Sequence, residues 1–375
     1  MFLYRSVIPD MPDPEAYAPL LREMHGNRWY SNFGPLAVRF EDALAARYGA
    51  GGSEACVCVT SATAGLSAAI MAAGVTGNVL VPAFTFPASL GAVRAAGAIP
   101  VVCDVDPDTW TVSPDILAQA LRSVSAQAVM IVEPFGIHQA LDALIDLCLD
   151  RGLAVIIDSA AGLGVPREPR PVRHNVFTVF SMHATKPFAV GEGGCVFAHR
   201  DHAVGLRSAV NFALPSHPGD ANVRWGFNGK MSELHAAVGL AQLERIDGIA
   251  GERQRQAAIY RDRLAGQEGL VTPDAIDRSP WQCFPVCLPS ASAAEALVAR
   301  AAAVGVEIRR YYRPSLSQWP DTAVAGACPA ADSLAGRMCV LPLRSGASQD
   351  EAPELMRRTV AAVLETMDDI GGSHV

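Results

Sequence analysis

The first half of the chain alternates between short apolar runs and longer segments with helical spacing. The apolar runs are "ACVCVT" (55–60), "NVLVP" (78–82), "IPVVCDVD" (99–106), "AVMIV" (128–132), "LAVIID" (153–158), "VFTVFS" (176–181) and "GGCVFAH" (193–199). Runs of this kind are typical of strands buried on both faces. Their alternation with helices predicts a parallel sheet that is covered by helices on both sides.

Helix signals separate the predicted strands. The segment "SATAGLSAAIMAAG" (61–74) has Ser61 near its N-cap and Gly74 after its end, and both residue types are typical of those positions. The next helix has Pro87 in its first turn, where proline is tolerated, and ends near Gly97. Two further helices are expected at 113–124 and around 138–150.

The pattern changes after Met231. A long amphipathic helix begins with "MSELHAAVGLAQLERID" (231–247). Beyond it, "WQCFPVCLP" (281–289) and "VEIRRYY" (306–312) are typical of strands placed among helices. The sequence therefore predicts an α/β protein with two domains. A large three-layer domain with a mainly parallel sheet covers residues 1–248, and a smaller C-terminal α+β domain covers residues 249–375.

The composition excludes several classes of protein. The chain has 375 residues, half of them hydrophobic, which allows a large buried core. Its net charge is −8 and it has no basic cluster, so nucleic acid is not an expected partner. No apolar run approaches the roughly 20 residues that span a bilayer. The N-terminus also lacks the pattern of a signal peptide. We therefore expect a cytoplasmic protein without a membrane partner.

The nine cysteines are scattered along the chain. Cys56 and Cys58 alternate within a predicted strand, and Cys283 and Cys287 flank apolar residues. Neither pair has a second pair or histidines at the spacing of a zinc site. We expect the cysteines to be small buried hydrophobes in a reducing compartment, and we expect no metal.

The residues just after the strands are the first candidates for chemistry, because ligands of such sheets bind outside the carboxyl ends of the strands. The segment "SATA" (61–64) opens a helix with small residues and the hydroxyls of Ser61 and Thr63. It is either a phosphate cradle or an ordinary serine N-cap. After the next strand, either Phe84 or Phe86 lies flat against a planar ring, unless both pack in the core.

Two charged residues follow the later strands. Asp158 comes directly after a run of apolar residues, where a carboxylate is costly to bury without a partner. It either caps the next turn or faces a cationic group of a ligand, such as a protonated pyridine nitrogen. Lys186 lies between two apolar runs. It is either a surface lysine on a hairpin or a lysine in an apolar cleft, where it becomes a nucleophilic amine able to form a Schiff base. Ser181 ends its strand and offers a hydroxyl to a phosphate. Together these groups meet the needs of pyridoxal 5′-phosphate (PLP).

Several motifs resemble those of the DegT/StrS-type sugar aminotransferases, PLP-dependent proteins of the aspartate aminotransferase fold (fold type I). The resemblance covers nearly the whole chain. The motifs that carry it are "GPLAVRFEDALAARYG", "TSATAGLSAAI", "VPAFTFPASLGAVRAAGAIPVVCDVDPDTWTVSP", "FSMHATKPFAVGEGG", "GFNGKMSELHAAVGLAQLERID", "RRYYRPSL" and "CVLPL". Of these, the lysine motif and the "MSELHAA…QLERID" motif are highly specific.

The resemblance implies a role for each candidate. Lys186 binds the cofactor aldehyde as a Schiff base and then moves the proton between substrate and cofactor. Asp158 pairs with the pyridine nitrogen. The remaining contacts belong to Phe86 and Ala160 on the two ring faces, and to Ala62, Thr63 and Ser181 at the phosphate. In the family, a residue of the "GxNxR" segment reaches the phosphate from the neighbouring subunit. Here Asn228 is the first candidate for that contact and Lys230 the second, so a homodimer is expected.

The chain departs from the family pattern at two places. Ala161 stands where the family usually has Gln or His, which removes one hydrogen bond to the cofactor. Gly229 and Lys230 stand where an aromatic residue and Arg are common, and lysine lacks the planar fork of arginine. For His183, which lies three residues before the lysine, we favour a structural role over an acid–base role.

The resemblance also implies transamination. An amino acid donor, glutamate or glutamine, would give its amino group through the cofactor to a keto group. The acceptor would be a nucleotide-linked sugar or a related specialised-metabolite ketone, as in antibiotic biosynthesis. Family members that dehydrate deoxysugars have His at the lysine position, whereas this chain has Lys186.

Other functions stay open at this point. Because Ala161 is small, the acceptor could instead be a keto-cyclitol or another ketone without a nucleotide. The protein could also be a PLP-dependent lyase or decarboxylase in place of an aminotransferase. A PLP-binding regulator would need a DNA-reading module, for which the chain has neither a basic stripe nor spare length. The segment "EIRRYYRPS" (307–315) either meets phosphates with its arginines or ends a strand with solvated ones.

Overall fold

A computed structural model describes residues 2–168, 171–215 and 223–371. Its centre is an eight-stranded sheet with the strand order β1-β7-β6-β5-β4-β2-β3-β10. Strand β7 runs antiparallel to both of its neighbours, β1 and β6, and the other pairs are parallel. The bounds of these strands are β1 Glu54–Val59, β2 Asn78–Pro82, β3 Ile99–Cys103, β4 Ala126–Val132, β5 Ala154–Asp158, β6 Val176–Ser181, β7 Gly194–His199 and β10 Ala323–Val324. The mainly parallel sheet predicted from the sequence is confirmed.

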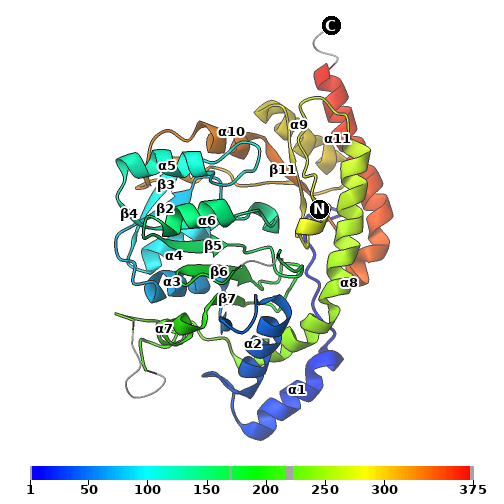
Figure 1. Ribbon diagram of the computed structural model, residues 1–375. Coiled ribbons are helices and arrows are strands. Elements are labelled where there is room, and N and C mark those ends of the chain that lie inside the picture. Colours follow the sequence, from blue (N-terminus) through cyan, green and yellow to red (C-terminus); the bar gives the residue numbers. More distant parts are fainter. Residues whose placement is uncertain (1, 169–170, 216–222, 372–375) are drawn as a thin grey trace.

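Helices cover both faces of this sheet (Figure 1). Valines of alternate strand positions pack against α3 (Ala62–Ala72), α4 (Pro87–Ala95) and α7 (Ala203–Ala209) on one face. On the other face, the residues between them in β2 to β5 pack against α5 (Pro114–Ser123) and α6 (Asp142–Leu149). Those of β1, β6 and β7 pack against α2 (Pro35–Tyr48) and α8 (Glu233–Leu264). Successive side chains of a strand point to opposite faces of the sheet. A strand that is apolar throughout therefore contributes to the hydrophobic core on each face.

The helix boundaries have local causes. Ser61 caps α3, because its hydroxyl accepts a hydrogen bond from the Ala64 amide at 3.2 Å. Pro87 occupies the first turn of α4, as expected. The helix predicted around 138–150 begins only at Asp142. The predicted start is too early because the amide of Gln139 donates to the Glu133 carboxylate at 3.0 Å, which holds that segment outside the helix.

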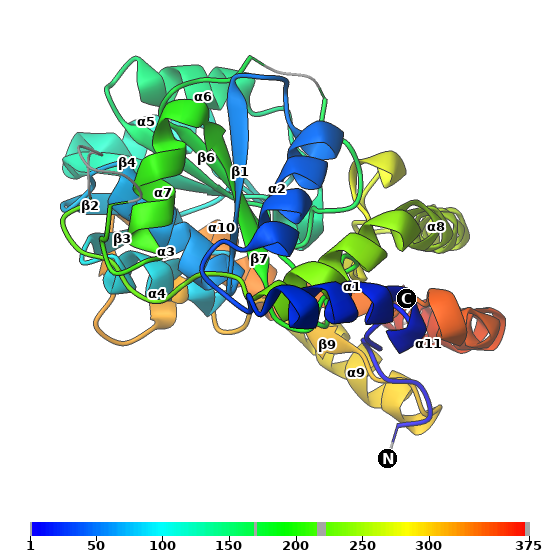
Figure 2. The same ribbon diagram turned by 90° about the horizontal axis from the view of Figure 1, so that it is seen from below.

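Helix α8 (Glu233–Leu264) is the longest of the described helices and continues well beyond the predicted segment. The expected domain boundary at residues 248 and 249 falls within it. Helices α1 (Pro14–Asn27) and α2 (Pro35–Tyr48) pack against α8, and so does α11 (Ala352–Gly371). Figures 1 and 2 show α8 running from the side of the large sheet toward α11. It thus connects the two parts of the molecule as one continuous element.

The C-terminal part contains a three-stranded antiparallel sheet with the order β8-β11-β9. Its elements are β8 Phe284–Cys287, α9 Ala291–Ala303, β9 Arg309–Arg310, α10 Pro329–Arg337 and β11 Met338–Leu341. The strand predicted for residues 306–312 is therefore only two residues long. The prediction was too long because Tyr312 turns away and stacks its ring on Phe135 of the large sheet region, with 5.5 Å between centroids.

Five short 3-10 turns complete the described elements. They are η1 Pro134–Gly136, η2 Arg200–His202, η3 Ile276–Arg278, η4 Leu316–Gln318 and η5 Gly346–Glu351. All nine cysteines are free and buried, as expected for small hydrophobes. Burial raises the pKa of the Cys148 thiol to about 12, for example. Among the described residues, no helix combines the length and the apolar character needed to cross a membrane.

Candidate active site

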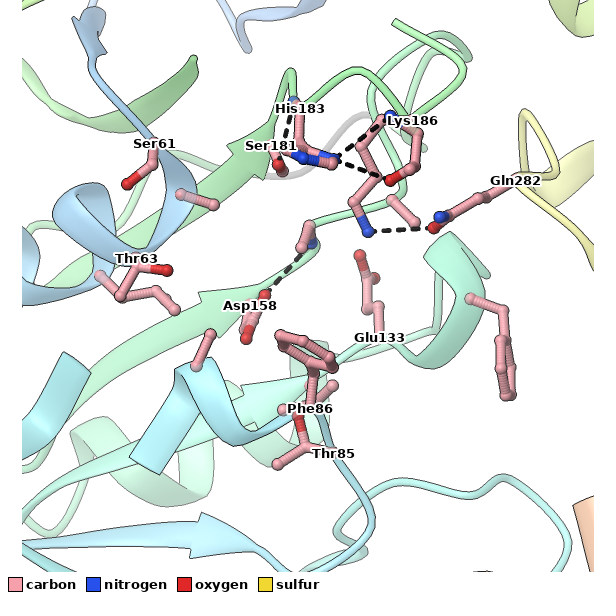
Figure 3. A pocket seen from close by; sticks show the side chains of 18 of the residues that line it. Ser61, Thr63, Thr85, Phe86, Glu133, Asp158, Ser181, His183, Lys186 and Gln282 are labelled. Carbon is pink, nitrogen blue, oxygen red and sulfur yellow. Dashed lines mark hydrogen bonds between the residues drawn. The ribbon is translucent and has the colours of Figure 1, made fainter. Parts of the chain in front are cut away.

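The residues predicted at the strand ends meet in one cavity of about 330 Å³. It lies where the parallel strands of the large sheet end, and Figure 3 shows its lining side chains. The predicted residues that line it are Ser61, Ala62, Thr63, Phe86, Asp158, Ala160, Ala161, Ser181, His183 and Lys186. In the view of Figure 3, Ser61 and Thr63 lie on one side of Asp158, and Lys186 lies on the other.

Asp158 ends β5 and is 6% exposed. Its carboxylate accepts a hydrogen bond from the Ser89 hydroxyl at 2.7 Å and another from the Ala160 amide at 3.2 Å. Burial raises the pKa of Asp158, although the Ser89 hydroxyl and the charge of Lys186 oppose this shift. A positive charge placed against this carboxylate would stabilise its ionised form, and a protonated pyridine nitrogen provides one.

Lys186 lies in the turn after β6. Its backbone amide donates to the carbonyl of His183 at 2.8 Å, and its Nζ donates to Gln282 Oε1 at 2.9 Å. Burial lowers the pKa of Lys186, while the charge of Asp158 opposes the shift. The neutral amine that attacks an aldehyde is thereby favoured. The His183 ring bonds to Thr185 at 2.9 Å, and this bond supports the structural role preferred for it.

The start of α3 is shaped to receive a phosphate. The Thr63 hydroxyl faces the cavity from an exposed position, and Ser181 adds a second hydroxyl. A Cβ at Gly194 would lie 2.7 Å from the Ala62 amide nitrogen, so only glycine leaves this amide approachable. Free amides at a helix N-terminus favour an anion. The residues present therefore fit PLP: the start of α3 would receive its phosphate, Asp158 would face its ring nitrogen, and Phe86 would cover one face of its ring.

Comparison with known proteins identifies the family. The family model for DegT/DnrJ/EryC1/StrS aminotransferases matches residues 14–359. The chain belongs to this family. As the resemblance implied, it is a PLP-dependent aminotransferase of the DegT/DnrJ/EryC1/StrS type.

Three similar proteins illustrate the range of this family. The dTDP-4-amino-4,6-dideoxy-D-glucose transaminase of Shigella dysenteriae is 30% identical over 287 residues, covering 75% of this chain and 76% of the relative. The L-glutamine:scyllo-inosose aminotransferase of Streptomyces griseus is 33% identical over 285 residues, covering 70% and 67%. The crystal structure of DesI in the presence of its TDP-sugar product matches with a TM-score of 0.84 and 29% identity, covering 100% of this chain and 97% of that chain.

Asn228 and Lys230 do not line the cavity of their own chain, as far as the described residues show. The Lys230 ammonium donates to Asn228 Oδ1 at 2.8 Å and lies 4.9 Å from the ring centre of Phe212. Asn228 is exposed, whereas Lys230 is buried within its own chain. The contact with a partner's phosphate stays a prediction.

The arginines of residues 307–315 also lie outside the cavity. Arg309 pairs with Glu307 at 2.8 Å, and Arg310 pairs with Glu295 at 3.2 Å. A strand end is therefore favoured over a phosphate contact, but these two arginines pair with glutamates and are not simply solvated. Only the two tyrosines of this segment, Tyr311 and Tyr312, reach the cavity.

Several polar residues of the cavity were not predicted from the sequence, and Gln282 and Glu133 are two of them. Gln282 is 96 positions from Lys186 and accepts a hydrogen bond from its Nζ. Glu133 follows β4 and has a side chain that is 1% exposed. The one sequence signal for Glu133 was its place directly after an apolar run, as for Asp158. Gln282 has no such signal, since it precedes its strand.

We expect Gln282→Ala to lower kcat by about three- to tenfold, because the variant loses one hydrogen bond to Lys186. Gln282→Glu keeps a hydrogen-bond acceptor at this position and adds a negative charge beside Lys186. A carboxylate there favours the ammonium form, so the acidic limb of the kcat–pH profile should move to higher pH. Steady-state kinetics across pH measures both effects. Profiles identical to the wild type for both variants would show that the bond to Gln282 has no role in turnover.

Glu133 forms the centre of a buried ionic cluster beside the cavity. Its carboxylate contacts the Arg167 guanidinium, lies 3.1 Å from His138 Nδ1 and accepts the Gln139 amide. Burial alone would raise the pKa of Glu133, but Arg167 and then His138 hold it below its usual range. The charge is thus retained in the interior next to Asp158. Removing one partner of such a buried pair leaves the other uncompensated.

We therefore expect Glu133→Gln to lower the free energy of unfolding by about 3 kcal/mol at pH 7. Because the folded-state pKa is depressed, the stabilisation is present above the ordinary carboxyl pKa and is lost as pH falls through the folded-state pKa. The difference between variant and wild type should shrink below about pH 4. Urea denaturation at several pH values measures it. The control is Glu168→Gln, which breaks an exposed 3.1 Å pair with Arg278 and should change stability by less than about 0.5 kcal/mol.

Proposed function

We propose that this protein moves an amino group from L-glutamate or L-glutamine to the keto group of a nucleotide-linked sugar. The observation that carries the proposal is one cavity that holds the Lys186 amine, the Asp158 carboxylate and the open N-terminus of α3. Two similar proteins support the acceptor class. The Shigella relative is named for a dTDP-linked amino sugar, and the DesI structure was determined in the presence of its TDP-sugar product.

PLP, when bound, supplies an aldehyde that takes up the amino group and a ring that withdraws electrons from the substrate carbon. Asp158 holds the ring nitrogen in its protonated form. Phe86 and Ala160 confine the two faces of the ring. Lys186 Nζ takes the proton from the donor α-carbon in the first half-reaction, and it returns a proton to the acceptor carbon in the second.

The phosphate is held by the residues around the start of α3. Ala62 offers its backbone amide, and Thr63 and Ser181 offer hydroxyls. Asn228, with Lys230 behind it, completes this group from a second copy of the chain. The active enzyme is therefore proposed to be a homodimer. Mixing Lys186→Ala with Asn228→Ala chains should restore one intact site per mixed dimer, and no restored turnover on mixing counts against the shared site.

A cyclitol acceptor is the second candidate. The Streptomyces griseus relative is named for scyllo-inosose, an acceptor without a nucleotide. Ala161, which is buried at the cavity wall, leaves space where the family usually has a larger polar side chain. This space suits a cyclic ketone that carries hydroxyl groups on every side.

Product analysis separates these functions. The purified enzyme with PLP is given L-glutamate or L-glutamine together with a TDP-linked keto-sugar or scyllo-inosose. The proposal expects one equivalent of oxo acid per aminated TDP-sugar and no release of carbon dioxide. Amination of scyllo-inosose alone would select the second candidate. Carbon dioxide, or an eliminated product without amine transfer, would select a decarboxylase or lyase and overturn both.

A further inference from the structure

Three histidines and an aspartate gather at the edge of the large sheet that faces away from the cofactor cavity. His174 lies in the turn before β6, His199 ends β7, and Asp201 and His202 belong to η2. Strand β6 separates His174 from Ser181, and its six residues span roughly 20 Å. The cluster is therefore outside the site described above.

The donor atoms have the spacing of a metal site. Asp201 Oδ2 lies 3.3 Å from His199 Nδ1 and 3.6 Å from His174 Nε2. One ligand atom from each of these three residues lies within 4.8 Å of the other two. A tetrahedral zinc site with metal–nitrogen bonds of 2.0–2.1 Å places its donors about 3.3 Å apart. The charge-assisted hydrogen bonds that these groups would otherwise form are shorter, at about 2.8 Å.

A fourth imidazole stands beside these three donors. The His202 ring is 4.4 Å from the His174 ring, centroid to centroid, and 4.6 Å from Phe177. Its Nε2 is buried and has no hydrogen-bond partner among residues 2–168, 171–215 and 223–371. His199 Nδ1 accepts a long hydrogen bond of 3.4 Å from the Asp201 amide, which a metal ion would have to replace. The side chains of His174 and Asp201 are 57% and 62% exposed, so an ion has access.

We propose that His174, His199 and Asp201 bind a divalent transition-metal ion such as Zn²⁺. Two imidazoles and one carboxylate suit zinc and its neighbours in the first transition series, whereas Mg²⁺ and Ca²⁺ prefer oxygen donors alone. Water or His202 supplies the fourth donor. The ion would join the end of β7 to the turn that leads into β6, and it would stabilise the folded chain by mass action.

The test uses the PLP-loaded protein without an affinity tag, stripped of metal and titrated with Zn²⁺ against a chromogenic chelator. We expect one site per chain and a thermal midpoint that rises with Zn²⁺ but does not change with Mg²⁺. His174→Ala and Asp201→Asn should each weaken Zn²⁺ binding by about tenfold or more. His25→Ala, a histidine of α1 far along the sequence from the cluster, is the matched control and should bind as the wild type does.

The readout does not depend on turnover, so its failure is distinct from failure of the aminotransferase proposal. His174 and Asp201 are exposed, so their variants should fold; equal thermal midpoints without metal check this. Absence of a Zn²⁺ site in the wild type would overturn the assignment. Zn²⁺ affinity unchanged in both cluster variants would overturn it equally, because the ion would then bind elsewhere.

Discussion

We expect Lys186→Ala to lower kcat by at least about 10³-fold, because the variant lacks both the amine that binds the cofactor and the group that moves the proton. The protein should also lose the visible absorbance of its bound PLP. Steady-state kinetics and absorbance spectra measure the two effects. The burial-lowered pKa of Lys186 and its bond to Gln282 are the structural basis of this expectation.

Lys186→Arg separates the chemistry of the amine from its charge. Arginine keeps a cation opposite Asp158 but stays protonated in proteins, so it can neither bind the aldehyde nor accept a proton. This variant should be as inactive as Lys186→Ala. Partial rescue of the alanine variant by a small added amine would support the proton-transfer role. Activity of the arginine variant near that of the wild type would assign Lys186 an electrostatic role only.

The second-largest effect is expected at Asp158. Asp158→Asn keeps the shape of the side chain but removes the charge that faces the ring nitrogen, and kcat should fall by about 10²- to 10³-fold. The PLP-bound spectrum should change as well, since the ring nitrogen loses its proton. Single-turnover reaction with L-glutamate measures the loss in the first half-reaction alone, separately from acceptor binding.

Ser89→Ala is the matched control for Asp158. The Ser89 hydroxyl donates to the same carboxylate at 2.7 Å but would touch neither cofactor nor substrate. Its loss removes one hydrogen bond to a charged group, so kcat should fall by no more than about tenfold. If Asp158→Asn and Ser89→Ala had equal effects, the aspartate would act by organising the protein and not by holding the ring nitrogen charged.

Much of the site could be predicted because it lies directly after parallel strands. Asp158, Ser181 and the 61–64 turn each follow an apolar run, and the carboxyl ends of such strands meet at one edge of the sheet. The helix cap at Ser61 and the first-turn proline at Pro87 were equally local signals. In each case the residues that decide the structure are neighbours in sequence.

The missed features depend on contacts between distant segments. Gln282 reaches Lys186 only because the chain leading into β8 passes over the cavity. Strand β10 is two residues long, too short for any periodicity, and it joins the large sheet beside β3. Tyr312 leaves its expected strand to stack on Phe135. No pattern within these segments indicates their partners, because their conformation is set by packing against distant parts of the chain.

The most direct measurement is borohydride reduction of the PLP-loaded protein followed by peptide mapping. The chain has only two lysines, Lys186 and Lys230, so these are the two side chains to which the reduced cofactor could be attached. We predict that the reduced cofactor is attached to Lys186 and that Lys230→Arg leaves this labelling intact. Label on Lys230, on the N-terminal amine, or on no residue would contradict the central role given to Lys186.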